Sequence, residues 1–339
     1  MLAIIAPTMV SCSGNDDDDL VGNWVKLGDF SGSPRTSATG TTLNDLGYIG
    51  LGYNYTQDER LSDFWTYDAD RNTWDQIADF PGNARTNAVS FAADGKLYVG
   101  SGFDGTSGER LKDFWEYNPT TNQWTEIAEL QSDNVNSPNV DGREGMTAFS
   151  INGVGYVLGG SDADGTAYKD MYAYDPAIGS WSKKADFGGS KRANAVAFVI
   201  GDYAYVCTGI SNGSYPNDFY RYDAVQDRWE ELRKISDNSD DSYDDDYDII
   251  RTNAVAFTAD GKGYIATGGR GSSGSDVWEY DPTTDLWTEK TSFEGSSRYN
   301  AVAFTIDGVG YVLTGQQGTT SNFDDMFRFD PNAEYEEND

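Results

Sequence analysis

The chain has 339 residues, with 56 acidic and 24 basic side chains, a formal net charge of -32 and no histidine. A protein without histidine has no Ser-His-Asp triad, no Cys-His pair, no His-ligated zinc, copper or haem, and no histidine general base. Its strong negative charge repels phosphate backbones and anionic membrane surfaces, so nucleic acid is not expected as a partner. Any catalysis must therefore use carboxylates, Tyr, Lys, Arg or Ser.

The composition favours one all-β domain over the two domains that length alone suggests. The sequence holds 38 Gly, 22 Tyr, 16 Phe and 9 Trp, a mixture of turn formers and strand formers that is typical of sheets. All-β barrels, sandwiches and propellers often reach this size as a single unit. An all-β fold with a substantial core is the prediction.

The first eleven residues are interpreted as the remnant of a signal peptide. Residues 1–11 are uncharged, mostly apolar and too short to span a bilayer as a helix. Met9-Val10-Ser11-Cys12 resembles a bacterial lipobox, in which the cysteine becomes the lipidated first residue of the mature protein. No Lys or Arg precedes this segment, so the true start of the signal is expected upstream. A disordered tail with an incidental cysteine is the alternative.

Residues 12–22 are predicted to be a lipidated cysteine followed by an acidic tether. Asp16 to Asp19 are four adjacent like charges, which stay solvated. An acidic run after a lipidated cysteine resembles the surface-export signal of Bacteroidetes lipoproteins. That resemblance implies an outer membrane lipoprotein exposed at the cell surface, or alternatively a periplasmic one. Cys207 lies in an apolar run and is expected to be a buried free thiol, because an acylated Cys12 could not pair with it.

Internal repeats decide the architecture. Tryptophan recurs at spacings of 50, 50, 57, 48 and 58 residues, at Trp24, Trp74, Trp124, Trp181, Trp229 and Trp287. An arginine follows each tryptophan: Arg35, Arg85, Arg143, Arg192, Arg251 and Arg298. After each arginine come a small-residue strand, a tight turn, an aromatic strand ending in glycine, a polar loop and a strand entered through aspartate. This order predicts a four-stranded meander in every copy.

A single meander cannot bury both of its faces, so a ring of six sheets is predicted, with the small-residue strand innermost. The copies resemble Kelch repeats, through a glycine pair that ends the second strand, as in Gly159-Gly160, and an aromatic residue seven positions before tryptophan, as in Tyr67 and Trp74. Some glycine pairs are altered, as at Thr208. The resemblance covers residues from about 24 to 336. It implies a six-bladed β-propeller like the central domain of galactose oxidase.

The sixth copy lacks its tryptophan strand, because Glu336 takes that place and three residues follow it. Residues 23–30, which contain Trp24, are predicted to supply the missing strand as the outer strand of the last blade. The propeller domain is therefore assigned to residues 23–336, with residues 337–339 as a tail.

The candidate ligand-binding residues lie where the inner strands begin. In a four-stranded meander the loop before the first strand and the loop between the second and third strands share one rim. The candidates are Arg35, Arg85, Arg143, Arg192, Arg251 and Arg298, with Asn87, Asn194, Asn253 and Asn300 two residues later and expected on the same strand face. Either each arginine pairs with the aspartate that begins a third strand, or some stay unpaired and form a cationic mouth for a carboxylate or acidic sugar.

Two insertions fall at the same rim. Residues 131–142 form a polar loop, and residues 236–248 contain seven aspartates. A solvated acidic loop is the simpler interpretation of the second insertion; a Ca²⁺ site is the alternative, since clustered carboxylates supply hard oxygen ligands. No other cofactor or metal is expected. The GxGxxG match at residues 100–105 belongs to the repeat and does not indicate dinucleotide binding.

The function expected from these patterns is a non-enzymatic binding module. It would be a monomeric domain, attached to a membrane only through its lipid, that presents the arginine-lined rim to a glycan or protein partner. The copper chemistry of galactose oxidase needs His ligands and is excluded. The alternative that the resemblance implies is a sugar mutarotase or epimerase of the Kelch sialic-acid mutarotase type. For its acid-base steps Glu144, beside Arg143, is the local candidate, although neighbouring strand residues point to opposite faces.

Overall fold

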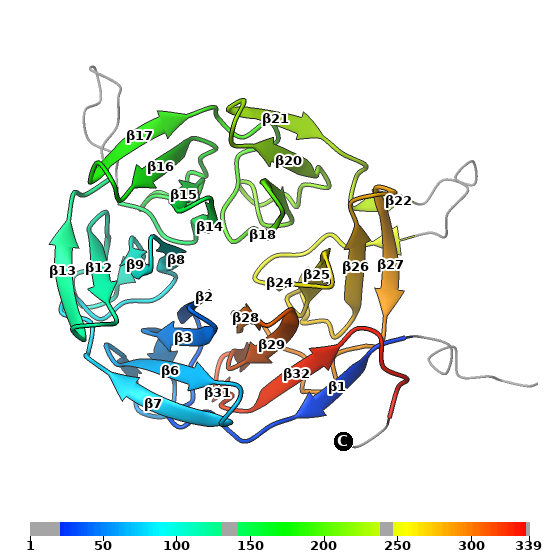
Figure 1. Ribbon diagram of the computed structural model, residues 1–339, viewed down its shortest axis with the longest axis horizontal. Coiled ribbons are helices and arrows are strands. Elements are labelled where there is room, and N and C mark those ends of the chain that lie inside the picture. Colours follow the sequence, from blue (N-terminus) through cyan, green and yellow to red (C-terminus); the bar gives the residue numbers. More distant parts are fainter. Residues whose placement is uncertain (1–20, 131–141, 238–246, 337–339) are drawn as a thin grey trace, which may run out of the picture.

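Each repeat folds into one antiparallel sheet of four strands, and six such sheets surround a central channel (Figure 1). The computed structural model describes residues 21–130, 142–237 and 247–336. Blade one consists of β2 (Thr39–Leu43), β3 (Leu46–Gly50), β6 (Phe64–Asp68) and β7 (Thr73–Ile77). Blade two consists of β8 (Val89–Ala93), β9 (Lys96–Gly100), β12 (Phe114–Asn118) and β13 (Gln123–Ile127). Blade three consists of β14 (Thr147–Ile151), β15 (Val154–Leu158), β16 (Met171–Asp175) and β17 (Ser180–Lys184). The predicted six-bladed propeller is confirmed.

The other three blades complete the circle. Blade four consists of β18 (Val196–Ile200), β19 (Tyr203–Cys207), β20 (Tyr220–Asp223) and β21 (Arg228–Glu231). Blade five consists of β24 (Val255–Ala259), β25 (Lys262–Ala266), β26 (Val277–Asp281) and β27 (Leu286–Lys290). Blade six consists of β28 (Val302–Ile306), β29 (Val309–Leu313), β32 (Met326–Asp330) and β1 (Asn23–Lys26). Four small hairpins add to the rim: β4 (Tyr53–Asn54) with β5 (Glu59–Arg60), β10 (Phe103–Asp104) with β11 (Glu109–Arg110), β22 (Ser236–Asp237) with β23 (Tyr247–Asp248), and β30 (Gln316–Gln317) with β31 (Ser321–Asn322).

The ring is closed by β1, as the missing tryptophan strand of the sixth copy predicts. Trp24 lies opposite Phe329 in an antiparallel register, so the first strand is the outer edge of the last blade (Figure 1). Its indole is fully buried and packs 4.9 Å from the Phe293 ring, which belongs to the segment that leaves blade five. The strand itself ends at Lys26, so residues 27–30 continue without regular strand pairing.

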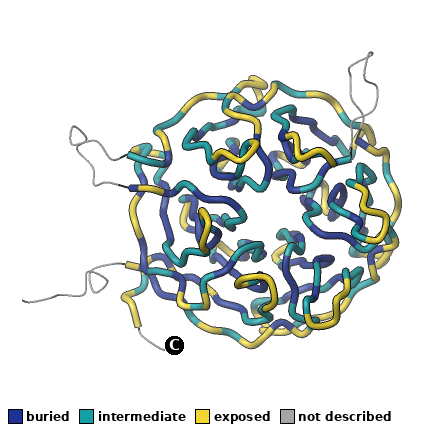
Figure 2. The backbone as a smooth tube through the Cα atoms, turned by 180° about the vertical axis from the view of Figure 1, so that it is seen from behind, coloured by how far each residue is buried: buried dark blue, intermediate teal, exposed yellow. Residues whose placement is uncertain are grey.

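The blades pack through an aromatic ring that enters the space left by a glycine. Phe91 and Tyr98 stack across β8 and β9 with 5.0 Å between their centroids. A Cβ at Gly155 of the next blade would overlap the Phe91 ring, so only glycine lets the two sheets come this close. Figure 2 shows the result: the inner strands are mostly buried, and the exposed segments lie at the turns and along the perimeter.

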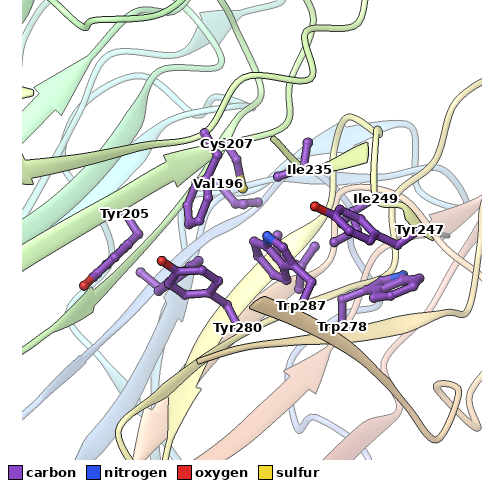
Figure 3. Packing of buried hydrophobic residues seen from close by; sticks show 12 residues of the cluster. Val196, Tyr205, Cys207, Ile235, Tyr247, Ile249, Trp278, Tyr280 and Trp287 are labelled. Carbon is purple, nitrogen blue, oxygen red and sulfur yellow. The ribbon is translucent and has the colours of Figure 1, made fainter. Parts of the chain in front are cut away.

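The largest buried cluster lies between blades four and five (Figure 3). Cys207 belongs to it, is fully buried and forms no disulfide, as predicted. Burial raises the pKa of its thiol to about 12, so the sulfur stays protonated and unreactive.

Several predictions concern residues outside the described ranges. Residues 1–20 include the signal peptide remnant, the lipidation site Cys12 and most of the tether, and residues 238–246 include most of the proposed Ca²⁺ loop. Those assignments stay predictions. Within residues 21–130, 142–237 and 247–336, no helix has the length and apolar character needed to cross a membrane. The same ranges contain no group of three or more His, Cys, Asp or Glu side chains arranged for a metal ion.

Candidate functional site

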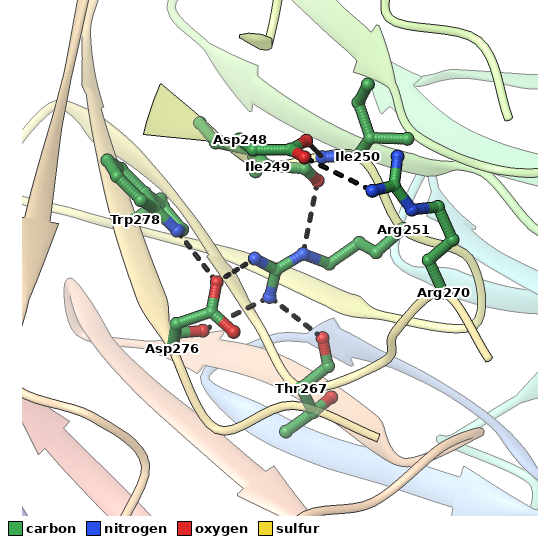
Figure 4. Close-up of polar contacts among 8 residues, drawn as sticks. All are labelled: Asp248, Ile249, Ile250, Arg251, Thr267, Arg270, Asp276 and Trp278. Atoms are coloured by element: carbon green, nitrogen blue, oxygen red, sulfur yellow. Dashed lines mark hydrogen bonds and ion pairs between the residues drawn. The ribbon is translucent and has the colours of Figure 1, made fainter. Parts of the chain in front are cut away.

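The repeat arginines are internal anchors of the blades. Arg85 donates from Nη1 and Nη2 to the two carboxylate oxygens of Asp113, at 2.6 and 2.8 Å. Its Nη1 also donates to the carbonyl of Ser101, and its Nε donates to the carbonyl of Asn83. An arginine–aspartate ion pair recurs in all six blades. In Arg192 and Arg251 only Nη2 reaches the carboxylate, as Figure 4 shows for Arg251.

This geometry corrects the expectation of an arginine-lined rim. The side chains of Arg35, Arg85, Arg143, Arg192, Arg251 and Arg298 are at most 4% exposed. Each guanidinium pairs with one carboxylate and donates to backbone carbonyls, although Arg143 Nε is left without a partner among the described residues, and a guanidinium without a carboxylate at such depth would be costly. Of the two interpretations open from the sequence, the structure has the paired one, and none of the six forms a cationic mouth.

The pairing also changes the titration of the aspartates. Burial by itself raises the pKa of the Asp63 carboxyl, and the same holds for Asp113. The hydrogen bonds and charge of the partner arginine, with the indole N–H of the tryptophan two residues later, outweigh that effect, so both pKa values lie below the ordinary value. The carboxylates therefore stay charged and paired over the range in which proteins usually work.

The arginine also holds a backbone bend at the end of the second strand. The carbonyl that accepts from Nη1 always belongs to a residue with positive φ: Leu51, Ser101, Gly159, Thr208, Thr267 and Thr314. Only one of these is glycine, so the altered glycine pairs of the sequence keep the left-handed bend without the residue that best tolerates it. The following glycine then donates its N–H to the arginine carbonyl of the next blade, as Gly102 does to Arg143 at 2.7 Å.

The asparagines form a ring at one mouth of the channel, but they are not part of the inner strands. Asn87, Asn194, Asn253 and Asn300 have φ between 53 and 55°, so the expected common strand face is wrong and β8 begins only at Val89. With Ser37 and Gly145 they join in a closed chain of backbone hydrogen bonds, in which each N–H donates to the carbonyl of the preceding blade at 2.8 to 3.4 Å. Asparagine suits this bend because its short polar side chain tolerates left-handed φ.

The channel below this ring is open and is lined mainly by small side chains and backbone. A cavity of about 150 Å³ lies within the ring of asparagines. Two further cavities, of about 180 and 380 Å³, follow along the inner strands and are lined by small residues such as Ala148, Ser150 and Thr258. The predicted placement of the small-residue strand at the centre is confirmed. These side chains offer hydroxyl groups and little that could do acid-base chemistry.

A charged cluster lies beside the mouth, between blades two and three. Glu144 Oε2 accepts a hydrogen bond from Asn87 Nδ2 at 2.9 Å, and Oε1 accepts from Arg110 Nε at 2.9 Å and lies 2.7 Å from Arg110 Nη2. The side chains of Arg110 and Glu144 are 25% and 18% exposed. Arg143 pairs with Asp170 instead, so the two adjacent residues 143 and 144 do not act together. Glu144 is therefore held by a neighbouring blade and faces the rim.

A second guanidinium extends this cluster toward blade one. Arg60 lies with its Cζ 5.4 Å from the centroid of the Tyr53 ring and 5.1 Å from that of Phe103, while Arg110 Cζ lies 4.6 Å from the same Phe103 centroid. Both arginines end a small hairpin, opposite an aromatic residue. The sequence reasoning missed them, although the shared Glu-Arg-Leu at residues 59–61 and 109–111 repeats in only these two loops and marked them as alike.

Comparison with known proteins agrees with this architecture. The profile of the Kelch motif matches residues 191–235, and the solved structure of YjhT aligns with a TM-score of 0.71 over 88% of this chain and 95% of that chain. The chain is a Kelch-type β-propeller. At 20% identity, the likeness of this Kelch propeller to YjhT concerns the fold alone. Kelch-like protein 15 of Danio rerio is 31% identical over 137 residues, which are 39% of the Kelch propeller and 20% of that protein.

Two further matches concern an enzyme. The profile of the N-acetylneuraminate epimerase family matches residues 32–175 of the Kelch propeller. The N-acetylneuraminate epimerase of Vibrio cholerae serotype O1 is 41% identical over 64 residues, which cover 16% of this chain and 16% of that protein. The matched segments thus span a fifth or less of these two curated relatives. The matches contradict the expected non-enzymatic module for a glycan or protein partner, and they favour the epimerase alternative.

Proposed function

We propose that this Kelch propeller is a sugar mutarotase of the N-acetylneuraminate epimerase type, with Glu144 as its acid-base residue. One observation carries the proposal: the segment that matches the epimerase family, residues 32–175, contains the whole cluster of Asn87, Arg110 and Glu144. In this cluster a carboxylate is fixed by two donors at the mouth of an open channel. That is the arrangement expected of a positioned general base.

The chemistry that a mutarotase needs is modest. To open a cyclic hemiketal, a base takes the proton of the anomeric hydroxyl, a proton reaches the ring oxygen, and the bond between the anomeric carbon and the ring oxygen breaks to leave a ketone. Reclosure on the other face of the ketone returns both protons and gives the other anomer. No redox step and no net proton change occur, so carboxylates and water suffice in a protein without histidine.

Each residue of the cluster has a separate part in this scheme. Glu144 accepts the proton of the anomeric hydroxyl and returns it on reclosure. Arg110 fixes one carboxylate oxygen through Nε and Nη2, and Asn87 fixes the other, so the side chain is oriented before the sugar arrives. Water at the open mouth supplies the proton for the ring oxygen.

The test is the rate of anomer exchange, followed by NMR from a sample of N-acetylneuraminate enriched in one anomer. The wild-type domain should reach equilibrium faster than buffer, and Glu144→Gln should lose about 10²- to 10⁴-fold of that acceleration, the usual contribution of a general base. Glu109→Gln is the matched control, because Glu109 is an exposed glutamate on the same hairpin as Arg110. Equal rates for wild type and buffer would overturn the proposal.

A further inference from the structure

We propose that Arg60 is the carboxylate-binding residue of this site and selects sugars that carry an acid group at the anomeric carbon. The proposal rests on the proposed function for the identity of the sugar. Its basis is the state of the Arg60 guanidinium, which differs from that of the anchoring arginines.

In the described part of the chain, Arg60 forms no ion pair with a carboxylate, and its Nε is buried without a hydrogen-bond partner. The side chain is half-buried, so its charge is neither fully hydrated nor neutralised by the protein. A buried donor without an acceptor is unfavourable in the free protein. Since Nε is closed to solvent, an anionic ligand would pair with the Nη groups of this guanidinium and neutralise its charge.

The surroundings keep the Arg60 guanidinium in place. Its flanking rings are Tyr53, its partner across β4 and β5, and Phe103 of the next blade. A Cβ at Gly105 would overlap the Arg60 guanidinium, so glycine at that position leaves it room. Aromatic faces on a guanidinium limit its contact with water and strengthen its attraction to an anion.

Arg60 also lies on the correct side of the proposed general base. The contacts run without a break from Arg60 to the Phe103 ring, from that ring to Arg110, and from Arg110 to Glu144. All four residues lie on one rim, over blades one to three. The Phe103 ring and Arg110 thus link Arg60 to Glu144 along this rim, and the proposal places the carboxylate of the sugar at Arg60 and its anomeric hydroxyl on the side of Glu144.

Charge gives a further reason for a dedicated arginine. The chain carries a net charge of -32, so an anionic sugar is repelled at long range and needs a local cation to bind. At this rim Arg110 is already neutralised by Glu144. Arg60 is the positive charge that remains in the cluster.

The experiment compares N-acetylneuraminate with its methyl ester, in which the acid group is neutral. Calorimetry should give the wild-type domain a preference for the acid of about tenfold or more, as expected for a charge-assisted bidentate pair. Arg60→Met, which keeps an apolar side chain of similar length, should raise the Kd of the acid to that of the ester and leave the Kd of the ester unchanged. Arg71→Met is the control, because Arg71 is an exposed arginine paired with Asp68 on a different turn.

A second variant tests the site without removing the charge. Gly105→Ala should displace the guanidinium and reduce the preference for the acid in the same direction as Arg60→Met. An unchanged preference in both variants would overturn the inference, whether or not anomer exchange is accelerated. A wild-type domain that prefers the acid through Arg60 but does not accelerate exchange would instead support the carboxylate site and contradict the proposed function.

Discussion

Asn87 Nδ2 donates a hydrogen bond of 2.9 Å to Glu144 Oε2, and this bond joins the inner segments of blades two and three at the channel mouth. The same asparagine has a φ of 54° and belongs to the closed backbone ring. One residue thus shapes the mouth with its backbone and orients the proposed base with its side chain.

The first prediction separates these two roles. Asn87→Gly keeps a residue that adopts positive φ but deletes the amide that holds Glu144. We expect the kcat of anomer exchange to fall about tenfold with little change in KM, since one oriented hydrogen bond is lost and sugar binding is not. Asn253→Gly makes the same backbone change at a ring position away from Glu144. If both variants exchange at the same rate, the Asn87 side chain does not position the base.

The second prediction concerns acid stability. The pKa values of Asp63 and Asp113 are lower in the folded protein than the value of about 3.9 for an unfolded aspartate. Their contribution to stability is therefore complete above about pH 4 and is lost as the pH falls from there through the lower, folded pKa values. Urea unfolding at a series of pH values should show this loss.

A variant is needed because protonation of the 56 acidic residues also relieves general repulsion as the pH falls. Asp113→Asn removes one titrating pair and keeps the shape of the side chain. It should be less stable than wild type at neutral pH, and its stability should fall less steeply on acidification. Parallel pH curves for the two proteins would mean that this pair is not linked to acid unfolding.

The third prediction uses two threonines in the same left-handed bend. Thr314 and Thr208 have φ of 60 and 61° and are fully buried. Among the described residues Thr314 Oγ1 has no hydrogen-bond partner, whereas Thr208 Oγ1 accepts from the Val196 N–H at 3.2 Å.

Thr314→Gly should stabilise the protein by about 1 kcal/mol, because relief of left-handed strain and of an unpaired hydroxyl exceeds the loss of one buried methyl. Thr208→Gly also deletes the hydrogen bond from the Val196 N–H to Oγ1, so its free energy of unfolding should be about 1 kcal/mol lower than that of Thr314→Gly. Denaturant unfolding gives both values. Equal changes in the two variants would show that the hydroxyl contacts do not matter.

The fourth prediction tests ring closure. Trp24 is fully buried and donates from Nε1 to the carbonyl of Thr291 at 3.3 Å. Trp24→Ala should lower the unfolding free energy by about 3 to 5 kcal/mol, the usual cost of deleting a large buried ring. Deleting residues 20–30 should open the ring altogether. Val225→Ala, at a residue that is 84% exposed, is the control; a Trp24 variant as stable as this control would contradict closure by β1.

The repeats made much of the fold predictable. Tryptophan spacing located the blades, and the missing strand of the last copy identified Trp24 as the residue that closes the ring. The pairing of Arg85 with Asp113 was one of two open interpretations, because sequence spacing does not show whether a guanidinium is buried.

The finer features of the site could not be predicted in the same way. The bend at Asn87 depends on a backbone hydrogen bond to Ser37, fifty residues earlier and in another blade. The position of Arg60 depends in a similar way on Phe103. Such contacts arise from the angle between adjacent sheets, and one repeat carries no information about that angle.

The closed backbone ring at the mouth has one electrical consequence. Its six N–H to carbonyl bonds run head to tail around the axis, each pointing to the preceding blade. Peptide dipoles arranged in a circle cancel as vectors, unlike the dipoles of a helix, which add along its axis. The ring therefore contributes no net axial potential at the entrance. The local charge that an anion meets there, after the long-range repulsion by the whole chain, comes from side chains such as Arg60, Arg110 and Glu144.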